Sequence, residues 1–151
     1  FVDARLVQSR QQLMTAIVQA IVGAMRRDPK RPDAEVGLKT PSIHSDLLWT
    51  LHSNNNIAEA LRRFGVSRTT RTLILVRVAP PLDAGELVQH MTQLVDGTLQ
   101  TRGLSLPSPA LAWSELGTAY KIQDTPAFQH PDTSQVDALI CSMVASKYVG
   151  A

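Results

Sequence analysis

The sequence predicts a single domain of the mixed α/β class, in which a central mixed sheet packs against helices. Three observations lead to this prediction. Segment 13–25 repeats apolar residues at three- and four-residue steps, as a helix with one buried face does. Stretches 43–51 and 73–78 are dense in apolar residues, as buried strands are, and two prolines close the second. A short helical pattern lies between them, which favours a crossover connection.

The expected elements follow from local signals along the chain. Asn56 or one of its neighbours is a natural N-cap for one helix and Thr133 for another, and Gly65 is placed to end a helix in the left-handed conformation. In chain order we expect the end of a strand at 1–4, a helix near 8–26, an exposed loop at 27–37, a strand near 43–51, a polar turn at 52–56, a helix at 57–64, a strand near 72–78, a helix near 84–95, an edge strand at 99–106, a short helix at 113–120, a loop at 121–131 and a last helix near 134–147.

Composition limits the classes of protein that this chain can be. Its 151 residues form one ordinary domain over 1–151, and 44% hydrophobic residues are enough to build a core. A net charge of +2 is too mild to diagnose nucleic-acid binding. The single cysteine, Cys141, lies in an apolar run and is expected to be a buried hydrophobe. Polar residues interrupt every apolar stretch well short of about 18 residues, so no membrane span is expected.

Residue patterns typical of catalysis or of cofactor binding are missing from the sequence. His44, Ser45 and Asp46 have the letters of a catalytic triad, but consecutive strand residues point to opposite faces and form no relay. The four histidines are scattered without metal-ligand spacing, and neither a Walker loop nor a dinucleotide glycine fingerprint occurs. We therefore expect no enzyme activity, no metal and no cofactor. The residue patterns alone predict an α/β domain that binds something.

Several blocks resemble one known family. Segment 52–66, His-Ser-Asn-Asn-Asn-Ile-Ala-Glu-Ala-Leu-Arg-Arg-Phe-Gly-Val, is similar to the signature of the PRPK-binding protein (TPRKB) family. Segments 44–48, 72–78, 120–122 and 137–143 resemble further family blocks in the same order. The chain looks like a fungal-like member. It departs from the family where His52-Ser53 replaces Ser-Pro, where 27–37 resembles an exposed insertion, and ahead of Phe1, where members carry further strands and a helix.

The resemblance implies a function as well as a fold. Members of this family are non-catalytic subunits of the KEOPS (EKC) complex and bind its small kinase-like ATPase. The complex adds the threonylcarbamoyl group to an adenosine of certain tRNAs, and in some relatives the subunit helps to hold the tRNA 3′ end. The resemblance also implies a place in the nucleus and cytoplasm and a link to telomeres. A small ligand-binding or enzymatic α/β domain, with a site that sequence does not reveal, is the alternative.

The predicted tRNA-binding residues surround the start of one helix. Helix N-terminal amides and side-chain amides suit phosphate oxygens and base edges, and arginines add a positive rim. The residues are Asn54, Asn55, Asn56, Arg62 and Arg63, with Arg68 and Arg71 as further rim candidates. The competing interpretation is that the asparagines only cap the helix and satisfy the turn, while the arginines are solvated.

The predicted kinase-binding residues are apolar positions on two helices, because protein interfaces concentrate their binding energy in a few apolar anchors. They are Ile57, Leu61, Val136, Leu139, Ile140 and Met143. Phe64 shares one side of its helix with Ile57 and Leu61, but we expect it to face the core instead.

Overall fold

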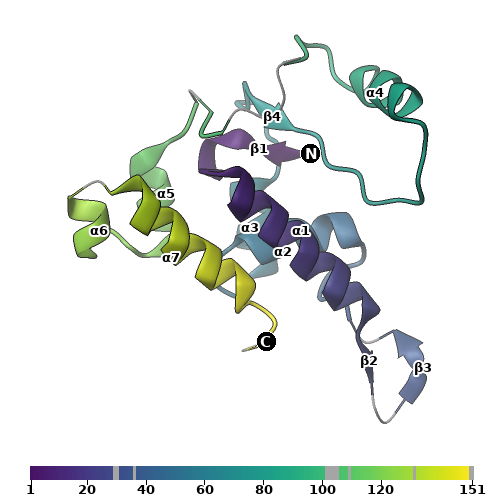
Figure 1. Ribbon diagram of the computed structural model, residues 1–151, viewed down its shortest axis with the longest axis horizontal. Helices are drawn as coiled ribbons and strands as arrows, with labels where there is room; N and C mark the ends of the chain where they lie inside the picture. The colour runs from purple at the N-terminus through teal and green to yellow at the C-terminus, as the bar shows by residue number, and fades with distance from the viewer. Residues whose placement is uncertain (29–30, 36, 101–105, 109, 131, 150–151) are drawn as a thin grey trace.

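The computed structural model describes residues 1–28, 31–35, 37–100, 106–108, 110–130 and 132–149. Figure 1 shows the elements, which follow in chain order. They are β1 (Val2–Asp3), the 3₁₀ turn η1 (Ala4–Leu6), α1 (Arg10–Met25), β2 (Arg27–Asp28), β3 (Arg31–Glu35), α2 (Ile43–Leu51), α3 (Ile57–Phe64), β4 (Leu73–Ile74), α4 (Ala84–Thr92), α5 (Trp113–Tyr120), α6 (Pro126–Gln129) and α7 (Thr133–Ala145).

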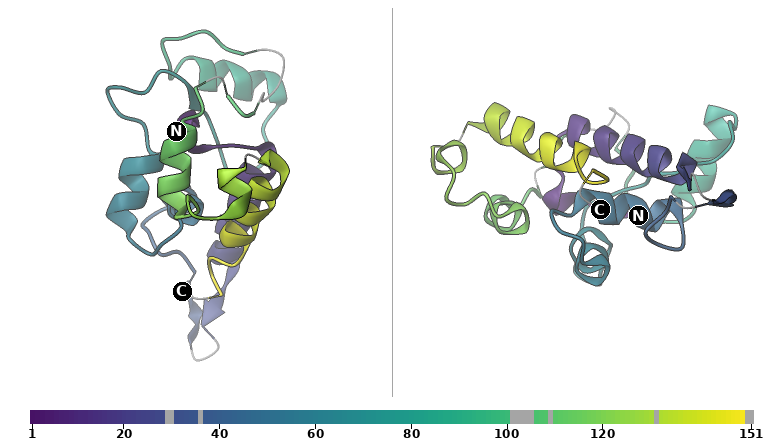
Figure 2. Two further views of the ribbon diagram at one scale, coloured as in Figure 1. Left: turned by 90° about the vertical axis from the view of Figure 1, so that its left-hand side faces the viewer. Right: turned by 90° about the horizontal axis from the view of Figure 1, so that it is seen from below.

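Helices build most of the fold. Helices α1 and α7 pack side by side in one layer, and α2 packs under α1 with α3 on its far side (Figure 2). Helix α4 lies on a long excursion between β4 and α5, away from this packing (Figure 1). The helices predicted at 8–26, 57–64, 84–95, 113–120 and 134–147 are confirmed, although α4 ends three residues earlier than predicted.

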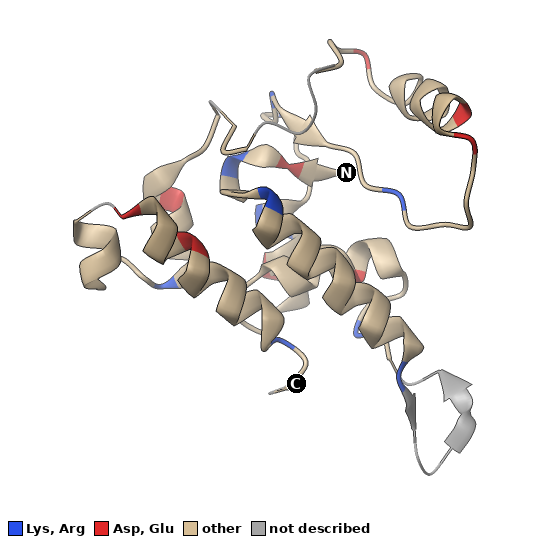
Figure 3. Ribbon diagram, viewed as in Figure 1, with Lys and Arg blue, Asp and Glu red and all other residues tan. Residues whose placement is uncertain are grey.

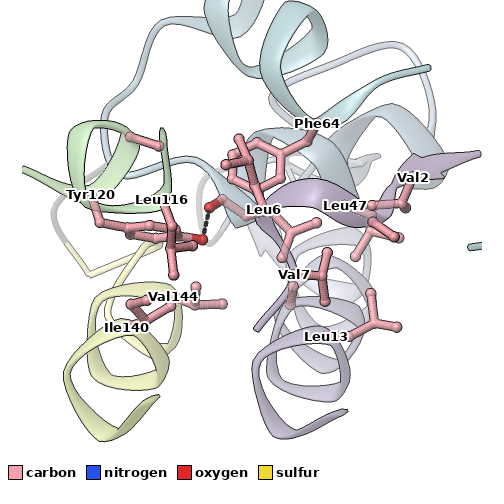
Figure 4. Packing of buried hydrophobic residues seen from close by; sticks show 14 of the residues in the cluster. Val2, Leu6, Val7, Leu13, Leu47, Phe64, Leu116, Tyr120, Ile140 and Val144 are labelled. Atoms are coloured by element: carbon pink, nitrogen blue, oxygen red, sulfur yellow. Dashed lines mark hydrogen bonds between the residues drawn. The ribbon is translucent and has the colours of Figure 1, made fainter. Parts of the chain in front are cut away.

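The hydrophobic core lies where α1, α2, α3, α5 and α7 meet, and Figure 4 shows its packing. Phe64, Leu116, Tyr120 and Ile140 are fully buried in it. The Tyr120 hydroxyl donates to the Leu51 carbonyl and accepts from Gln12 Nε2 at 2.8 Å, so these three buried polar groups satisfy one another. Phe64 is therefore a core residue, as predicted.

The mixed α/β class is confirmed, but the sheet is much smaller than the predicted central mixed sheet. In the part of the chain that the structure describes, β1 pairs antiparallel with β4 (Val2 opposite Ile74), and β2 pairs antiparallel with β3. The strand predicted at 72–78 is thus reduced to Leu73–Ile74, because β1 supplies only two partner residues. The loop predicted at 27–37 contains the β2–β3 hairpin instead.

The strand predicted at 43–51 is wrong: this segment is helix α2. Ser42 caps it, since its side chain accepts from the Ser45 amide at 3.1 Å while Ser45 Oγ accepts from the Ser42 amide at 3.2 Å. Leu47 and Leu51, four residues apart, face the core. A dense apolar run fits a buried helix as well as a strand, and the serine pair was the overlooked signal.

Smaller corrections concern helix ends and loops. Asp132 caps α7 in place of Thr133, and the loop predicted at 121–131 contains α6. Gly65 ends α3 at a φ of −76°, so it does not use the left-handed conformation. Asn56 is the N-cap of α3, as predicted. Most of the edge strand predicted at 99–106 lies outside the described residues.

Candidate functional site

The turn between α2 and α3, residues 52–56, has its own network of hydrogen bonds. His52 Nδ1 accepts from the Asn54 amide at 3.2 Å, and Asn54 Oδ1 accepts from the Asn56 amide at 2.9 Å. Asn56 Oδ1 in turn accepts from the Glu59 amide at 3.0 Å, which caps α3. The competing structural interpretation therefore holds for Asn54 and Asn56, whose oxygens support the turn. The side-chain amide of Asn55 makes no hydrogen bond to the described residues, and Asn55 is exposed.

Distant segments also hold this turn. Ser53 Oγ donates to the Ala119 carbonyl at 2.6 Å, which ties the turn to α5. Lys147 Nζ, just beyond α7, donates to the carbonyl of His52 at 2.6 Å and to that of Asn54. The turn is thus fixed from two sides by residues that follow it in sequence by more than sixty positions.

The basic groups at the turn are held in a poorly solvated environment. Desolvation lowers the pKa of Lys147 to about 8, and its Nζ lies 4.5 Å from the centre of the Trp49 ring, within cation–π range. Burial likewise lowers the pKa of His52 below its ordinary value. This shift favours the neutral imidazole, the form in which Nδ1 can accept a hydrogen bond.

Beside the turn lies a shallow recess of about 350 Å³. Its lining comes from the turn and from the end of α7: Ser53, Asn54, Asn55, Met143, Ser146 and Lys147. The structure thus brings two predicted tRNA-binding residues together with one predicted kinase anchor, Met143. Sequence reasoning missed Lys147. Its only signal was a lone lysine after the run 138–146, which contains only apolar and small residues.

Arg62 and Arg63 do not line this recess. Both pair with Glu59 Oε1 on their own helix, at 3.1 Å from Arg62 Nη2 and at 2.6 Å from Arg63 Nε. The hydrogen bond from Arg63 is the main reason that the pKa of Glu59 lies below its ordinary value. One acidic side chain therefore offsets part of the positive rim predicted on α3.

The predicted kinase anchors divide into buried and accessible residues. Val136 and Ile140 are fully buried, so they belong to the core and present no surface to a partner. Leu139 and Met143 are partly buried against the same core. Ile57 and Leu61 are 37% and 40% exposed, so they are accessible on α3.

Helix α1 has an apolar face that points away from the core. The three- and four-residue repeat in 13–25 did not predict which apolar residues would lie on this face. Met14, Val18, Val22 and Met25 recur at four-, four- and three-residue steps and are between 44% and 72% exposed. We call these four residues the α1 row. The buried face predicted from the repeat consisted of Leu13, Met14, Ile17, Val18, Ile21, Val22 and Met25, and only Leu13 of these is fully buried. Small residues fill most of the inner face of α1, which buries Ala16, Ala20 and Gly23.

Close packing explains these small residues. Any side chain added at Gly23 would collide with the Tyr148 ring, so α1 can approach the end of α7 only through glycine at this position. No acidic or basic residue occurs between Arg10 and Arg26, and Figure 3 shows α1 without charge beyond its first turn. A surface helix normally carries charged or polar residues outward. The α1 row therefore has the character of an interface rather than of a solvated face.

A groove of about 350 Å³, lined mainly by apolar residues, flanks α1 on a side other than that of the α1 row. Leu13 and Ile17 of α1, the segment 74–77, and Leu87 and Met91 of α4 line it. Leu87 and Met91 of α4 are only partly buried where they line this groove. The groove therefore remains open between the core and the segment that carries α4.

The described residues present no constellation typical of catalysis. His44 Nε2 accepts from the Val78 amide at 3.1 Å, Ser45 bonds to Ser42, and Asp46 accepts from the amides of Lys39 and Thr40. These three residues of the triad-like segment therefore have separate partners. Across the described ranges, no three His, Cys, Asp or Glu side chains gather as a metal site. None of the helices in those ranges is long and apolar enough to cross a membrane.

Comparison with known proteins gives a consistent result. The model of the family "Kinase binding protein CGI-121" matches residues 1–148. The EKC/KEOPS complex subunit CGI121 of Gibberella zeae is 36% identical over 104 residues, which cover 64% of this chain and 48% of the relative. The subunits of the same name from Neurospora crassa and Candida glabrata are 25% and 24% identical, over 96% and 95% of this chain and 76% of each relative. The chain thus spans about half the length of the first relative.

Proposed function

Because the chain belongs to the family of the kinase binding protein CGI-121, we propose that it is a non-catalytic subunit of the EKC/KEOPS complex that binds the complex's small kinase-like ATPase. Its role would be to support threonylcarbamoyladenosine modification of tRNA. The names of the relatives and the motif at 52–66 support this proposal. The single structural observation that carries it is the α1 row, four exposed apolar residues on a helix that has no charged residue between Arg10 and Arg26.

The α1 row is the surface that we propose for the kinase. The centre of a protein interface is depleted of charge and enriched in apolar anchors such as methionine, and the row has both properties. Ile57 and Leu61 on α3 remain a second candidate surface. Since α1 and α3 lie on opposite sides of α2 (Figure 2), one flat partner surface does not cover both. Mutations can therefore separate the two.

The test places a charge on each surface in turn. Val18→Asp on α1, Ile57→Asp on α3 and Met143→Asp on α7 are compared by circular dichroism and by affinity for the kinase subunit. We expect Val18→Asp to fold and to bind at least about thirtyfold more weakly, because an unpaired charge would be buried in the interface. Gln89→Asp, on the exposed face of α4, is the matched control. Normal binding by Val18→Asp together with lost binding by Ile57→Asp would move the interface to α3.

We further propose that the asparagine turn contacts tRNA, with Asn54 and Asn55 in the lining of the recess and with Arg62 and Arg63 on the adjoining helix α3. The exposed amide of Asn55 and the cation of Lys147 suit phosphate oxygens and base edges. Replacing Arg62 and Arg63 together with alanine should weaken tRNA binding and flatten its salt dependence. The double variant Arg10→Ala/Lys39→Ala removes the same charge from other elements. An unchanged salt slope for the α3 pair would place the RNA elsewhere.

The alternative of a small ligand-binding or enzymatic domain would have to use this recess or the groove beside α1. The described lining of the recess contains one basic side chain and no acid, and its two serine hydroxyls donate to the carbonyls of Ala119 and Met143. The groove lining adds only Arg77 to apolar residues. We therefore expect the purified chain to leave ATP and tRNA chemically unchanged. Turnover that copurifies with the chain through several columns, and that Lys147→Met abolishes, would favour this alternative.

A further inference from the structure

Lys147 and Tyr148, which follow the C-cap residue of α7, contact three other segments of the chain. Lys147 and Tyr148 are 7% and 4% exposed, although the residues on either side of them are exposed. We call this pair the C-terminal clamp. It is not part of any helix, and neither residue is used by the kinase surface proposed above. Its burial therefore calls for a separate explanation.

Tyr148 anchors the clamp to α1 and α2. Its hydroxyl donates to Asp46, its ring meets Trp49 edge-on at 5.3 Å, and its carbonyl accepts from Arg26 Nη1 at 3.3 Å. These contacts do not involve the turn at 52–56. Tyr148 is thus a structural anchor, which makes it a useful internal control.

Lys147 makes different contacts. Its Nζ donates to the carbonyls of His52 and Asn54, which flank Ser53, and lies over the Trp49 ring. Hydrogen bonds from an ammonium group are about twice as strong as neutral ones, and burial strengthens them further. Two of the three ammonium donors hold the turn, and one remains.

These contacts fix one wall of the recess against the other. Asn54 and Asn55 form the wall from the turn, and Met143 and Ser146 form the wall from α7. The side-chain bonds within the turn shape it locally but do not attach it to α7. Among the described residues, Lys147 supplies the hydrogen bonds that join the two walls.

We propose that Lys147 is a positioning residue: it holds the asparagine turn against the end of α7, so that Asn54 and Asn55 face a nucleic-acid ligand in one fixed arrangement. This inference rests on the proposed tRNA contact for its ligand, but the positioning itself is a property of the free protein. The two parts can therefore be tested separately.

The experiment compares three variants with the unmodified chain. Lys147→Met keeps the apolar stem and removes the donors. Tyr148→Phe removes a buried hydrogen bond from the same clamp without touching the turn, and Lys39→Met removes an exposed lysine. Amide hydrogen exchange at Asn54, Asn55 and Asn56, unfolding by urea, and binding of a tRNA transcript are measured for each.

We expect Lys147→Met to speed exchange at the Asn54 and Asn56 amides, which have acceptors within the turn, by about tenfold or more, since it removes hydrogen bonds to a charged group that hold the turn. Its affinity for tRNA should fall by a similar factor, while Tyr148→Phe and Lys39→Met stay within about twofold of the unmodified chain. Lys147→Gln, which retains amide donors without the charge, should give an intermediate exchange rate. It decides the matter if Lys147→Met does not fold.

Two results would overturn the inference. One is turn exchange that rises as much in Tyr148→Phe as in Lys147→Met, because Lys147 would then contribute only to global stability. The other is faster turn exchange in Lys147→Met with unchanged tRNA affinity. If the unmodified chain fails to bind tRNA, the proposed tRNA contact is wrong, while the exchange comparison still decides whether Lys147 positions the turn.

Discussion

Helices α3 and α4 have similar lengths and begin in the same way, but only one of them is part of the core. Asn56 caps α3 through the Glu59 amide, and Asp83 caps α4 through the amides of Gly85 and Glu86. Helix α3 buries Ala60 and Phe64 completely, whereas α4 buries no residue. A cap and a favourable composition are thus enough to start a helix, and tertiary contacts decide whether it is stable.

The surroundings of Phe64 explain the difference. Its ring meets the rings of His52 and Tyr120 edge-on, at 6.1 and 6.2 Å, so α3 is joined to the turn and to α5 through aromatic packing. Leu87 and Met91 of α4 line only an open groove. We therefore expect α3 to unfold with the whole domain and α4 to open by itself.

The largest expected effect comes from the core side of this comparison. Phe64→Ala should lower the free energy of unfolding by about 3–5 kcal/mol, because it leaves a cavity among three elements. Leu87→Ala should cost less than about 1 kcal/mol, since its side chain is already partly solvated. Urea denaturation followed by circular dichroism measures both. Similar losses for the two variants would show that α4 is integral to the domain.

A smaller effect should separate the two caps. Asn56→Ala should lower global stability by about 1 kcal/mol, the usual cost of losing an N-cap. Asp83→Ala removes an equivalent cap, but its cost should appear as faster hydrogen exchange within α4 while the urea midpoint stays unchanged. Equal shifts of the midpoint in both variants would contradict the idea that α4 opens independently.

The smallest effect concerns pH and the turn that precedes α3. The pKa of Lys147 is about 8 in the folded protein, below its ordinary value, so the unfolded chain binds more protons between these two values. Stability should therefore rise with pH above 8 relative to Lys147→Met, by less than about 1 kcal/mol up to pH 9. Burial raises the pKa of Cys141 to about 11, but this affects both proteins alike. Parallel curves from pH 7 to 9 would contradict the prediction.

Local signals identified most of the helices. The three- and four-residue repeat located α1 and α7, and the asparagines before Ile57 located the start of α3. The family followed from the order of several short blocks. The strand predictions for 43–51 and 72–78 were inaccurate for the same reason. A run of apolar residues indicates that a segment is buried, but it does not indicate whether the segment is a helix or a strand. A serine pair made the first a helix, and a short partner limited the second to two paired residues.

The candidate site shows the same division. Sequence alone determined that residues 52–56 form a polar turn and that Asn56 caps α3, because these depend on neighbours in the chain. Only the tertiary structure decided that Val136 and Ile140 are core, that the α1 row faces outward, and that Lys147 reaches the turn. Those outcomes depend on which face of a helix meets a neighbour, and on contacts between residues more than ninety positions apart. A repeat specifies a helix, but the elements packed around it choose the side that is buried.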